Sequence, residues 1–238
     1  MPTPYGIEIN ESCVGCDRRD ERYFCALDSD ELRGLDQLRF ATVYPRGSLL
    51  FVEGQPARGV YMVCAGQVKL STSTGDARVL ITNLAGPGEL LGLSAVISGR
   101  PYEVTAETLE PSQVNFIRRE DFLRFLAENG GAALRVAEQL SNNYRAAFGQ
   151  ARLLGLSGTA AGKLSRLLLE CASRHGRPQG LSTSLRLTLT HEEIGQLIGA
   201  SRETVTRLFT EFKGQRLIEV RGSTLVLLDR PGLEAIAA

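Results

Sequence analysis

Three cysteines near the N-terminus have the spacing of a metal-binding motif. In the stretch ESCVGCDRRDERYFCAL, Cys13, Cys16 and Cys25 form the pattern C-x2-C-x8-C. A C-x2-C step lets two thiolates meet one metal ion or cluster without strain, and thiolates are soft ligands that select zinc or iron–sulfur clusters. The pattern therefore predicts a metal centre in this polar, arginine-rich arm. Three ligands leave one position to fill.

Other roles for these cysteines stay open at the level of the sequence. The thiols could pack as small buried hydrophobes, hold structural zinc, or form a bare thiol redox switch. The chain has 5 cysteines, an odd number that suits a disulfide framework poorly, and its first residues do not read as a secretory signal. We therefore expect a cytoplasmic protein with reduced thiols. Cys171 follows an apolar run and is expected to pack in a core.

A second segment, LTHEEIGQLIGASRETVTRLFTEF, predicts two short helices joined by a tight turn. Thr190 and Glu193 have the spacing of a capping box for a helix that begins near His191. Gly199-Ala200 ends that helix and Ser201 caps the next one. The residues of the second helix that should face inward are Val205, Leu208 and Phe212. A helix-turn-helix of this kind places its second helix in the major groove of DNA.

The outer face of this second helix carries side chains that suit base edges. An arginine can donate to both acceptors of guanine, and a glutamate can accept from the cytosine amino group. The residues expected to read bases are Arg202, Glu203, Thr206 and Arg207. Those expected to contact phosphates, which position a protein without reading sequence, are Thr190, Ser201, Thr204 and Arg221. The charge of this part of the chain gives weak support for DNA binding, because residues 159–238 hold 11 Lys and Arg against 8 Asp and Glu in a chain of net charge zero.

The elements that must position these residues change in character along the chain. Short β-rich runs separated by glycines, such as Val60–Cys64 and Val68–Thr72 with a hairpin tip at Gly75-Asp76, predict a β-roll or jelly roll. A long helix follows, and the end of the chain reads as an amphipathic helix, the helix-turn-helix and a hairpin wing around Arg221-Gly222-Ser223. This is an α+β organisation. The expected domains are a cysteine-containing arm over 1–28, a β-roll over 29–125, a dimerisation helix over 126–157 and a winged helix-turn-helix domain over 158–238.

The long helix carries small and apolar residues at heptad spacing, with alternating steps of 4 and 3 residues. Alanines on such a seam let two helices approach closely. Packing of this helix on its own domain is the alternative, but a homodimer fits better because the helix lies between two domains. The expected dimer seam consists of Ala133, Ala137, Leu140, Tyr144, Ala147, Ala151 and Leu154.

Two classes of protein are excluded by the sequence. The chain contains no G-x-S-x-G elbow, P-loop or H-E-x-x-H helix, and it has 2 histidines, so we do not expect an enzyme. Those histidines, His175 and His191, lie in the expected DNA-binding domain and are poorly placed to join the arm. No apolar run approaches the ~20 residues that a membrane-spanning helix needs, so we expect no membrane partner.

Over essentially its whole length the chain resembles the Crp/Fnr family of bacterial transcription regulators, most specifically in EEIGQLIGASRETVTRLFTEF. The resemblance implies a β-roll of the cyclic-nucleotide-binding type, a long dimerisation helix and a C-terminal winged helix-turn-helix. Arg202, Glu203 and Arg207 stand where cAMP-responsive members carry their base readers, which implies double-stranded DNA with half-sites resembling TGTGA. A two-fold dimer would read two half-sites about one helical turn apart. RNA polymerase is a further partner that the resemblance implies.

The resemblance does not extend to the cyclic-nucleotide site. In cAMP-binding members, a glutamate after a glycine takes the ribose and an Arg-Ser pair takes the phosphate. Here Leu93 follows Gly92, and Pro101, which has neither a hydroxyl nor an N–H, follows Arg100. A buried polar ligand with unmade hydrogen bonds loses much of its affinity. We therefore expect that the roll does not bind cAMP; another, unidentified small effector in the roll, with zinc-binding or metal-free cysteines, is the alternative.

The cysteine arm resembles that of the oxygen-sensing members of the family. Those proteins hold a [4Fe–4S] cluster, which oxygen destroys, on N-terminal cysteines and one further cysteine in the roll. This implies a regulator that responds to oxygen or redox state through an iron–sulfur cluster on Cys13, Cys16 and Cys25. Asn115, in EPSQVNFI, stands where the fourth cysteine is expected, and the spacing from Cys16 to Cys25 is longer. The fourth ligand would be Cys64, a carboxylate such as Asp17 or Asp20, or no protein group.

Overall fold

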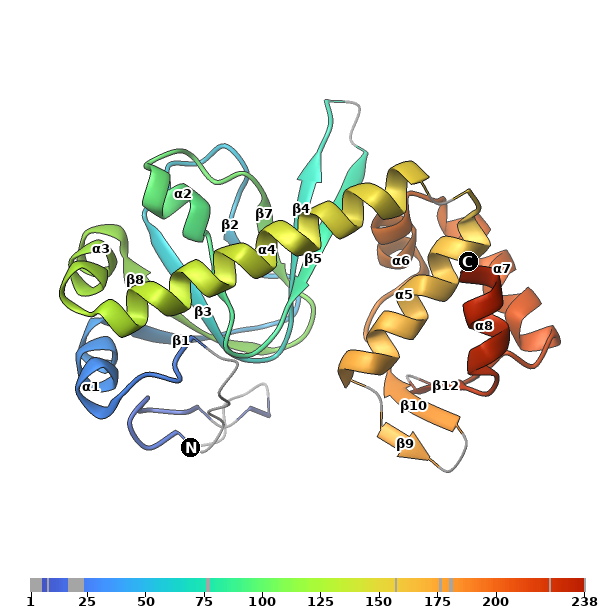
Figure 1. Cartoon of the computed structure of the whole chain (residues 1–238), viewed down its shortest axis with the longest axis horizontal. Coiled ribbons are helices and arrows are strands. Elements are labelled where there is room, and N and C mark those ends of the chain that lie inside the picture. The colour runs from blue at the N-terminus through green and yellow to red at the C-terminus, as the bar shows by residue number, and fades with distance from the viewer. Residues whose placement is uncertain are drawn as a thin grey trace. The chain divides into compact units, whose positions relative to one another are not determined.

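The computed structural model describes residues 6–7, 9–16, 24–75, 78–156, 158–175, 177–179, 182–222 and 224–237. It divides into two compact units, Met1–Ala147 and Phe148–Ala238, which Figure 1 colours from blue to red along the chain. The expected α+β class, with a roll followed by a helix-turn-helix, is confirmed. Asp17, Asp20, Asp76 and Ser223, and the side chain of His175, lie outside what is described. We find no candidate for a membrane-spanning segment among the described helices.

The first unit is built around a roll of two antiparallel sheets, each four-stranded within the described residues. One sheet has the order β1-β8-β3-β6 and the other β2-β7-β4-β5. The strands are β1 (Phe40–Tyr44), β2 (Leu49–Phe51), β3 (Gly59–Ala65), β4 (Val68–Ser73), β5 (Val79–Ala85), β6 (Leu90–Leu91), β7 (Thr105–Thr108) and β8 (Ser112–Arg118). The runs expected at 60–64 and 68–72 therefore lie within β3 and β4.

Strand β3 has two different faces, because successive side chains of a strand point to opposite sides of its sheet. Val63 packs in the interior of the roll with Ala106 and Val114. Val60 and Met62 point to the other side, into a separate core that also contains residues of the arm and of the helices. The outer face of this sheet is therefore where the helices and the cysteine arm meet the roll.

Helix α1 (Ser29–Leu38), which the sequence analysis missed, lies on this outer core beside α3 (Arg119–Glu128). A capping box starts it: the Asp28 carboxylate accepts the backbone N–H of Glu31, and the Glu31 carboxylate accepts the backbone N–H of Asp28. Leu32 and Leu35 are buried in the outer core. The spacing of Asp28 and Glu31 is the signal in the sequence that would have found this helix.

Helix α4 (Gly130–Leu156) begins four residues after the expected start at 126, because the extended backbone of Asn129 ends α3 first. Its first turns pack on the roll, where Ala132 and Val136 are buried. Gln139 then joins the helix to β6: its amide donates to the Leu90 carbonyl at 2.7 Å and its carbonyl accepts the Leu90 N–H at 3.1 Å. One side of α4 therefore packs against the roll of its own chain.

The opposite side of α4 exposes large apolar side chains. Leu134, Tyr144 and Phe148 are 63%, 73% and 58% exposed, respectively. Within the expected seam, Ala137, Ala147 and Ala151 are also exposed, whereas Leu140 packs partly against the outer core. The exposed apolar stripe is therefore rotated slightly from the expected one. Burial of Ala132 and Val136 against the roll, which the heptad spacing alone does not fix, sets this rotation.

The second unit contains the expected helix-turn-helix and wing. Its helices are α5 (Ala160–His175), α6 (His191–Ile198), α7 (Arg202–Gly214) and α8 (Arg230–Ala237). Its sheet has the order β11-β12-β10-β9, from β9 (Arg177–Gln179), β10 (Ser182–Arg186), β11 (Ile218–Arg221) and β12 (Thr224–Leu227). The hairpin β11–β12 is the expected wing, whereas α8 and the hairpin β9–β10 were not expected. Cys171 is partly buried on α5.

Glycines make the tight turn between α6 and α7. Gly199 ends α6 in the left-handed region, with φ 67°, which costs glycine little. At Gly195 an added Cβ would lie 2.5 Å from the carbonyl oxygen of Ala200, so only glycine lets the two helices come this close. The capping box of Thr190 and Glu193 and the Ser201 cap of α7 are both confirmed.

Candidate functional site

Helix α7 presents the expected base-reading residues to solvent. Val205, Leu208 and Phe212 are buried and fix the helix on its unit. At the start of the helix, the Ser201 hydroxyl accepts the Thr204 N–H at 3.2 Å. The side chains of Arg202, Glu203, Thr206 and Arg207 are all exposed on the outer face. Geometry therefore brings all four together on one capped, well-packed element.

Two of these side chains, Glu203 and Thr206, make hydrogen bonds within the protein. Hydrogen bonds from its own backbone N–H and from the Ser201 hydroxyl lower the pKa of Glu203, so this side chain is an ionised acceptor at neutral pH. The Thr206 hydroxyl donates to the Arg202 carbonyl at 2.9 Å. His191 Nδ1 lies 2.9 Å from the same hydroxyl, and because the hydroxyl proton is already used, Nδ1–H is the donor of this bond. A base contact in which the Thr206 hydroxyl donates would have to replace its bond to the Arg202 carbonyl.

His191 is a residue of this surface that the sequence analysis did not assign. Its ring stacks on Phe209, with centroids 4.7 Å apart. Partial burial and then the positive charges of Arg202 and Lys213 lower its pKa, so the ring is neutral at physiological pH. Its position, fifteen residues before Thr206 in the sequence, gave no local signal for this contact.

The expected phosphate-contacting residues already have partners within the protein. The Thr190 hydroxyl accepts the Glu193 N–H at 3.2 Å and lies 2.9 Å from the Glu193 carboxylate. Ser201 and Thr204 bond to one another through their hydroxyls at 3.1 Å. In the wing, Arg221 makes a two-pronged ion pair with Glu219, at 2.8 and 2.9 Å. These groups frame α7, and a phosphate would share or replace the bonds they make now.

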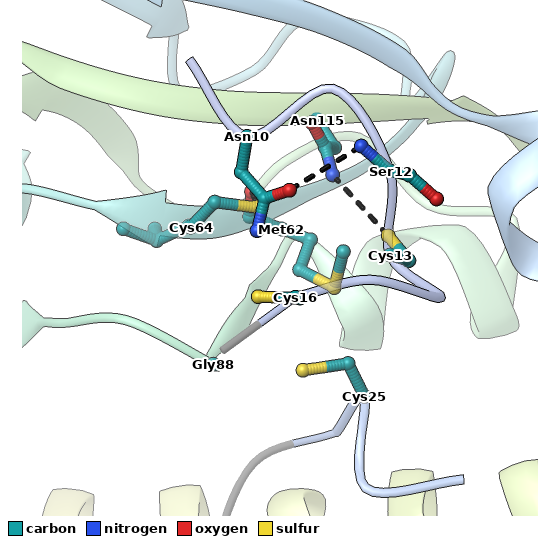
Figure 2. Close-up of a pocket in the computed structure, with 10 residues that line it drawn as sticks. Asn10, Ser12, Cys13, Cys16, Cys25, Met62, Cys64, Gly88 and Asn115 are labelled. Carbon is teal, nitrogen blue, oxygen red and sulfur yellow. Dashed lines mark hydrogen bonds between the residues drawn. The ribbon is translucent and has the colours of Figure 1, made fainter. Parts of the chain in front are cut away.

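A cavity on the outer face of the roll gathers cysteines from distant parts of the chain. Figure 2 shows Cys13, Cys16 and Cys25 of the arm and Cys64 of β3 around one space. Its volume is about 30 Å³, close to the share of one water molecule in the liquid. The other lining residues are Asn10, Ser12, Met62, Val63, Gly88 and Asn115. All five cysteines of the chain are thiols.

The course of β3 explains how Cys64 reaches this cavity. Met62 pairs with Asn115 and Val63 with Val114, but the next pair joins Ala65 to Gln113. Cys64 is therefore the extra residue of a β-bulge, a feature that re-aims side chains and is common beside functional sites. It joins the outer core together with Met62.

Polar residues of α1 and β8 hold the arm against the roll, and the sequence analysis missed them. The Gln113 side chain makes two bonds to the backbone of Asn10, at 2.8 and 2.9 Å. The Asp36 carboxylate accepts the Cys13 N–H at 2.8 Å and the Ser12 hydroxyl at 2.9 Å. Partial burial alone would raise the pKa of Asp36, but these bonds and the one from Arg39 lower it below its usual range. The ionised carboxylate thus fixes the position of Cys13.

The thiols of Cys13 and Cys64 are protonated in this arrangement. Burial raises the pKa of Cys13 to about 12 and that of Cys64 to about 12, and the three arm cysteines add to the shift at Cys64. Asn115, where the resemblance leads us to expect a fourth cysteine, lies beside them: its amide nitrogen is 4.0 Å from the sulfur of Cys13, and its oxygen accepts from Arg39 at 3.4 Å. Within the described residues, no three His, Cys, Asp or Glu side chains are arranged to hold a metal ion.

At the place expected for a cyclic nucleotide, Gly92 packs against the ring of Tyr102. Gly92, with φ 79°, precedes the short helix α2 (Leu93–Ser98), and Leu93 is buried. The ring of Tyr102 would lie 2.7 Å from a Cβ at Gly92, and its hydroxyl donates to the Gly59 carbonyl at 2.6 Å. No carboxylate stands at position 93 to take a ribose, which supports the expectation that cAMP is not the effector.

Comparison with protein-family models gives two matches. Residues 41–129 match the cyclic nucleotide-binding domain, and residues 162–236 match the Crp-like helix-turn-helix domain. The matched ranges cover the roll with α3, and the part of the second unit that contains α6, α7 and the wing.

Whole-length similarity extends to known regulators. The transcriptional activator protein anr of Pseudomonas aeruginosa is 30% identical over 217 residues, which are 89% of this chain and 86% of that protein. The nitrogen fixation regulation protein FixK of Bradyrhizobium diazoefficiens is 28% identical over 238 residues, covering 100% and 99%. The solved structure of FixK2 from Bradyrhizobium japonicum has the same fold, with a TM-score of 0.75 at 24% identity, over 84% of this chain and 98% of that one.

Proposed function

The chain belongs to the Crp/Fnr family of DNA-binding transcription regulators, and we propose that it is a homodimer whose DNA binding responds to oxygen or redox state through an iron–sulfur cluster on the N-terminal arm. Membership of this family makes it a regulator and not an enzyme. One observation carries the sensing part of the proposal: the three arm thiols face a shared cavity on the roll (Figure 2).

Sequence-specific binding would rest on the outer face of α7. Arg202, Glu203 and Arg207 are exposed side chains that can pair with guanine, cytosine and guanine edges, respectively, in the major groove. Such readers fit a TGTGA-like half-site. The hydroxyls at both helix starts and Arg221 of the wing flank this face and would contact phosphates. RNA polymerase is the expected further partner of a bound regulator of this family.

The dimer would form along the exposed side of α4. The exposed stripe contains Leu134, Ala137, Tyr144, Phe148 and Ala151. Successive members are separated by 3, 7, 4 and 3 residues, which is the spacing of a heptad pattern. Exposed apolar side chains on a long helix are stabilised when a second copy covers them. The proposed seam therefore keeps Ala137, Ala151 and Tyr144 of the expected one, and adds Leu134 and Phe148.

The residues of the arm fit an iron–sulfur cluster by the chemistry of their donors. Cys13, Cys16 and Cys25 supply sulfur ligands on one side of a small cavity, and thiolates are the ligands that hold such clusters. When bound, a cluster would supply a group whose integrity and charge depend on oxygen and redox state. The thiols must lose their protons to bind it. Because the cavity is small and the thiols are not arranged as ligands, binding would also require the arm to shift.

A shift of the arm has a direct route to α4 within the first unit. Cys13 and Phe24 share the outer core with Ala132 and Val136 of α4. The Glu31 carboxylate, which caps α1, also accepts the Ala132 N–H at 3.2 Å. A signal can shift a dimer only through its difference in free energy between two arrangements of the protein. Rearrangement of the arm would alter contacts that belong to both α1 and α4, and so would bias the dimer.

The test of this proposal is anaerobic purification followed by visible absorption, iron, sulfide and zinc analysis, and binding to a duplex with two TGTGA-like half-sites. We expect iron and sulfide, absorption that air bleaches, and DNA affinity that changes with it; Cys16→Ser should lose all three, whereas Cys171→Ser should keep them. Zinc without iron, or cysteines without metal, would contradict the cluster. Absence of sequence-specific binding in every redox state would contradict the regulator itself.

A second candidate signal is a small effector in the roll. A cavity of about 370 Å³ there has a size within the range of small-molecule sites. Its lining consists of the aromatic residues Phe51, Tyr61 and Tyr102, the cation Arg58, and Leu50, Gln55 and Pro56. Calorimetry with cyclic nucleotides and small aromatic anions tests this candidate. A saturable ligand that changes DNA affinity in protein without iron would favour it over the cluster.

A further inference from the structure

We infer that Cys64 of β3, rather than a residue at position 115 of β8, supplies the fourth protein ligand to the cluster. This inference rests on the proposed function, because it takes the arm cysteines as the other three ligands. Cys64 lies in the roll, 39 residues beyond Cys25 in the sequence, yet it lines the same cavity as all three arm thiols (Figure 2).

The course of β3 supports this assignment, because Cys64 lies on the same face of the strand as Val60 and Met62 and has no register partner on β8. In a regular register, Cys64 would have a partner on β8, but β8 passes directly from Val114, opposite Val63, to Gln113, opposite Ala65. Cys64 faces the arm's side of the sheet, like Met62 two residues before it, and its thiol makes a long hydrogen bond to the Met62 carbonyl, at 3.8 Å. The bulge places a thiol one strand away from Asn115, whose register partner is Met62.

The other donors around the cavity are weaker candidates. Asn115 is buried, its amide oxygen accepts from Arg39, and its amide nitrogen points toward the sulfur of Cys13. It is therefore better suited to be a neighbour of the site than a ligand. Met62 has a thioether, but it carries no negative charge and is 1% exposed within the outer core. The remaining thiol, Cys171, belongs to the second unit. Cys64 is thus the fourth thiol on the cavity, and it completes a set of four.

The experiment is a ligand exchange across the β3–β8 pair, performed on the anaerobic full-length dimer. We expect Cys64→Ser to lower the content of iron and acid-labile sulfide by more than about tenfold, because even partners outside the ligand set cost about 10–100-fold in metal affinity. The double variant Cys64→Ala with Asn115→Cys moves the thiol to the neighbouring strand and should regain the cluster. Cys171→Ser is the matched control and should keep full iron. Circular dichroism confirms that each variant is folded.

The outcomes separate this inference from the proposed function. If the wild-type protein holds a cluster and Cys64→Ser keeps it at full content, with unchanged visible absorption, the assignment of Cys64 is contradicted but the proposed function is not. Wild-type protein without iron contradicts both. Loss of the cluster in Cys64→Ser together with recovery in the double variant supports the assignment, because a merely destabilised roll would not be repaired by a second change in its core. Loss of the cluster in both variants with a folded roll would contradict the assignment, because a thiol returned to the cavity would then not restore what the change at Cys64 removed.

Discussion

The proposed base readers all come from residues 202–207 of one capped helix. The lining of the thiol cavity, by contrast, comes from four places: the arm, strand β3, strand β8 and the loop that precedes β6. The reading face is complete once α7 forms and packs. At the cavity, Asp36 and Gln113 hold the arm on the roll through hydrogen bonds to Cys13 and Asn10. A site built on one rigid element tolerates changes elsewhere, but a site assembled from distant segments depends on each contact between them.

This contrast predicts that the two regions can be broken separately. Substitutions in α7 should change DNA preference and leave iron content as it is. Substitutions around the arm should change iron content and leave the preference for bases as it is. The proposed dimer face of α4 would serve DNA binding through both half-sites, and its loss should have the largest effect.

Phe148→Glu should dissociate the dimer, because it places a charge within the exposed apolar stripe of α4. We expect affinity for a duplex with two half-sites to fall by about 10²–10⁴-fold, the usual size of an avidity gain, while iron content is unchanged. Light scattering and fluorescence anisotropy measure the two effects. Leu49→Glu is the matched control, since Leu49 is 55% exposed on β2 against 58% for Phe148. A variant that stays dimeric would place the interface elsewhere.

Asp36→Ala should undock the arm at Cys13 without touching a thiol. Removal of the carboxylate leaves the Cys13 N–H and the Ser12 hydroxyl without their acceptor. We expect retention of iron against a chelator to weaken by about 10–100-fold, with the order of preference among DNA sequences unchanged. Asp30→Ala on the same helix, where the carboxylate pairs with Arg33 at the surface, should retain iron as the wild type does. Equal retention in both variants would remove Asp36 from the account.

Arg207→Ala should change which DNA sequence is preferred. Loss of a two-pronged contact to guanine costs about 1–3 kcal/mol and relaxes one base position in each half-site. Competition binding with duplexes changed at single positions measures this, and Arg230→Ala on α8 is the control. Uniform weakening across all duplexes would mean that Arg207 contacts phosphate rather than a base.

Glu31→Ala should have the smallest effect, on stability. The substitution removes half of the capping box of α1 and the acceptor for the Ala132 N–H of α4. We expect a loss of about 1 kcal/mol in the free energy of unfolding, seen as a lower urea midpoint with an unchanged slope. Glu128→Ala, an exposed change on α3, should leave the midpoint in place. The same midpoint in both would show that Glu31 does not join α1 to α4.

What the sequence predicts well in this chain is local. The capping box of Thr190 and Glu193 and the buried face of α7 depend on residues a few positions apart, and both followed from spacing alone. The rotation of the α4 stripe did not, because several heptad phases fit the same alanines until burial of Val136 against the roll chooses one.

The thiol cavity was predicted only in part, for a related reason. The C-x2-C step identified the arm, and Cys64 remained one of several candidates for the fourth ligand. Its position depends on the register of β3 with β8, and arm docking depends on contacts such as that of Asn10 with Gln113, 103 residues apart. No short pattern encodes such contacts. The cap at Asp28, by contrast, was a local signal that was overlooked.

The most direct test of the central claim, that the arm's cysteines control DNA binding, is a single anaerobic titration followed by controlled addition of air. Visible absorption and the anisotropy of a labelled duplex with two TGTGA-like half-sites are recorded on the same sample, beside Cys16→Ser. We predict that DNA affinity changes in step with the bleaching of the absorption, and that the variant shows neither change. DNA affinity that stays constant while the absorption bleaches would contradict the account.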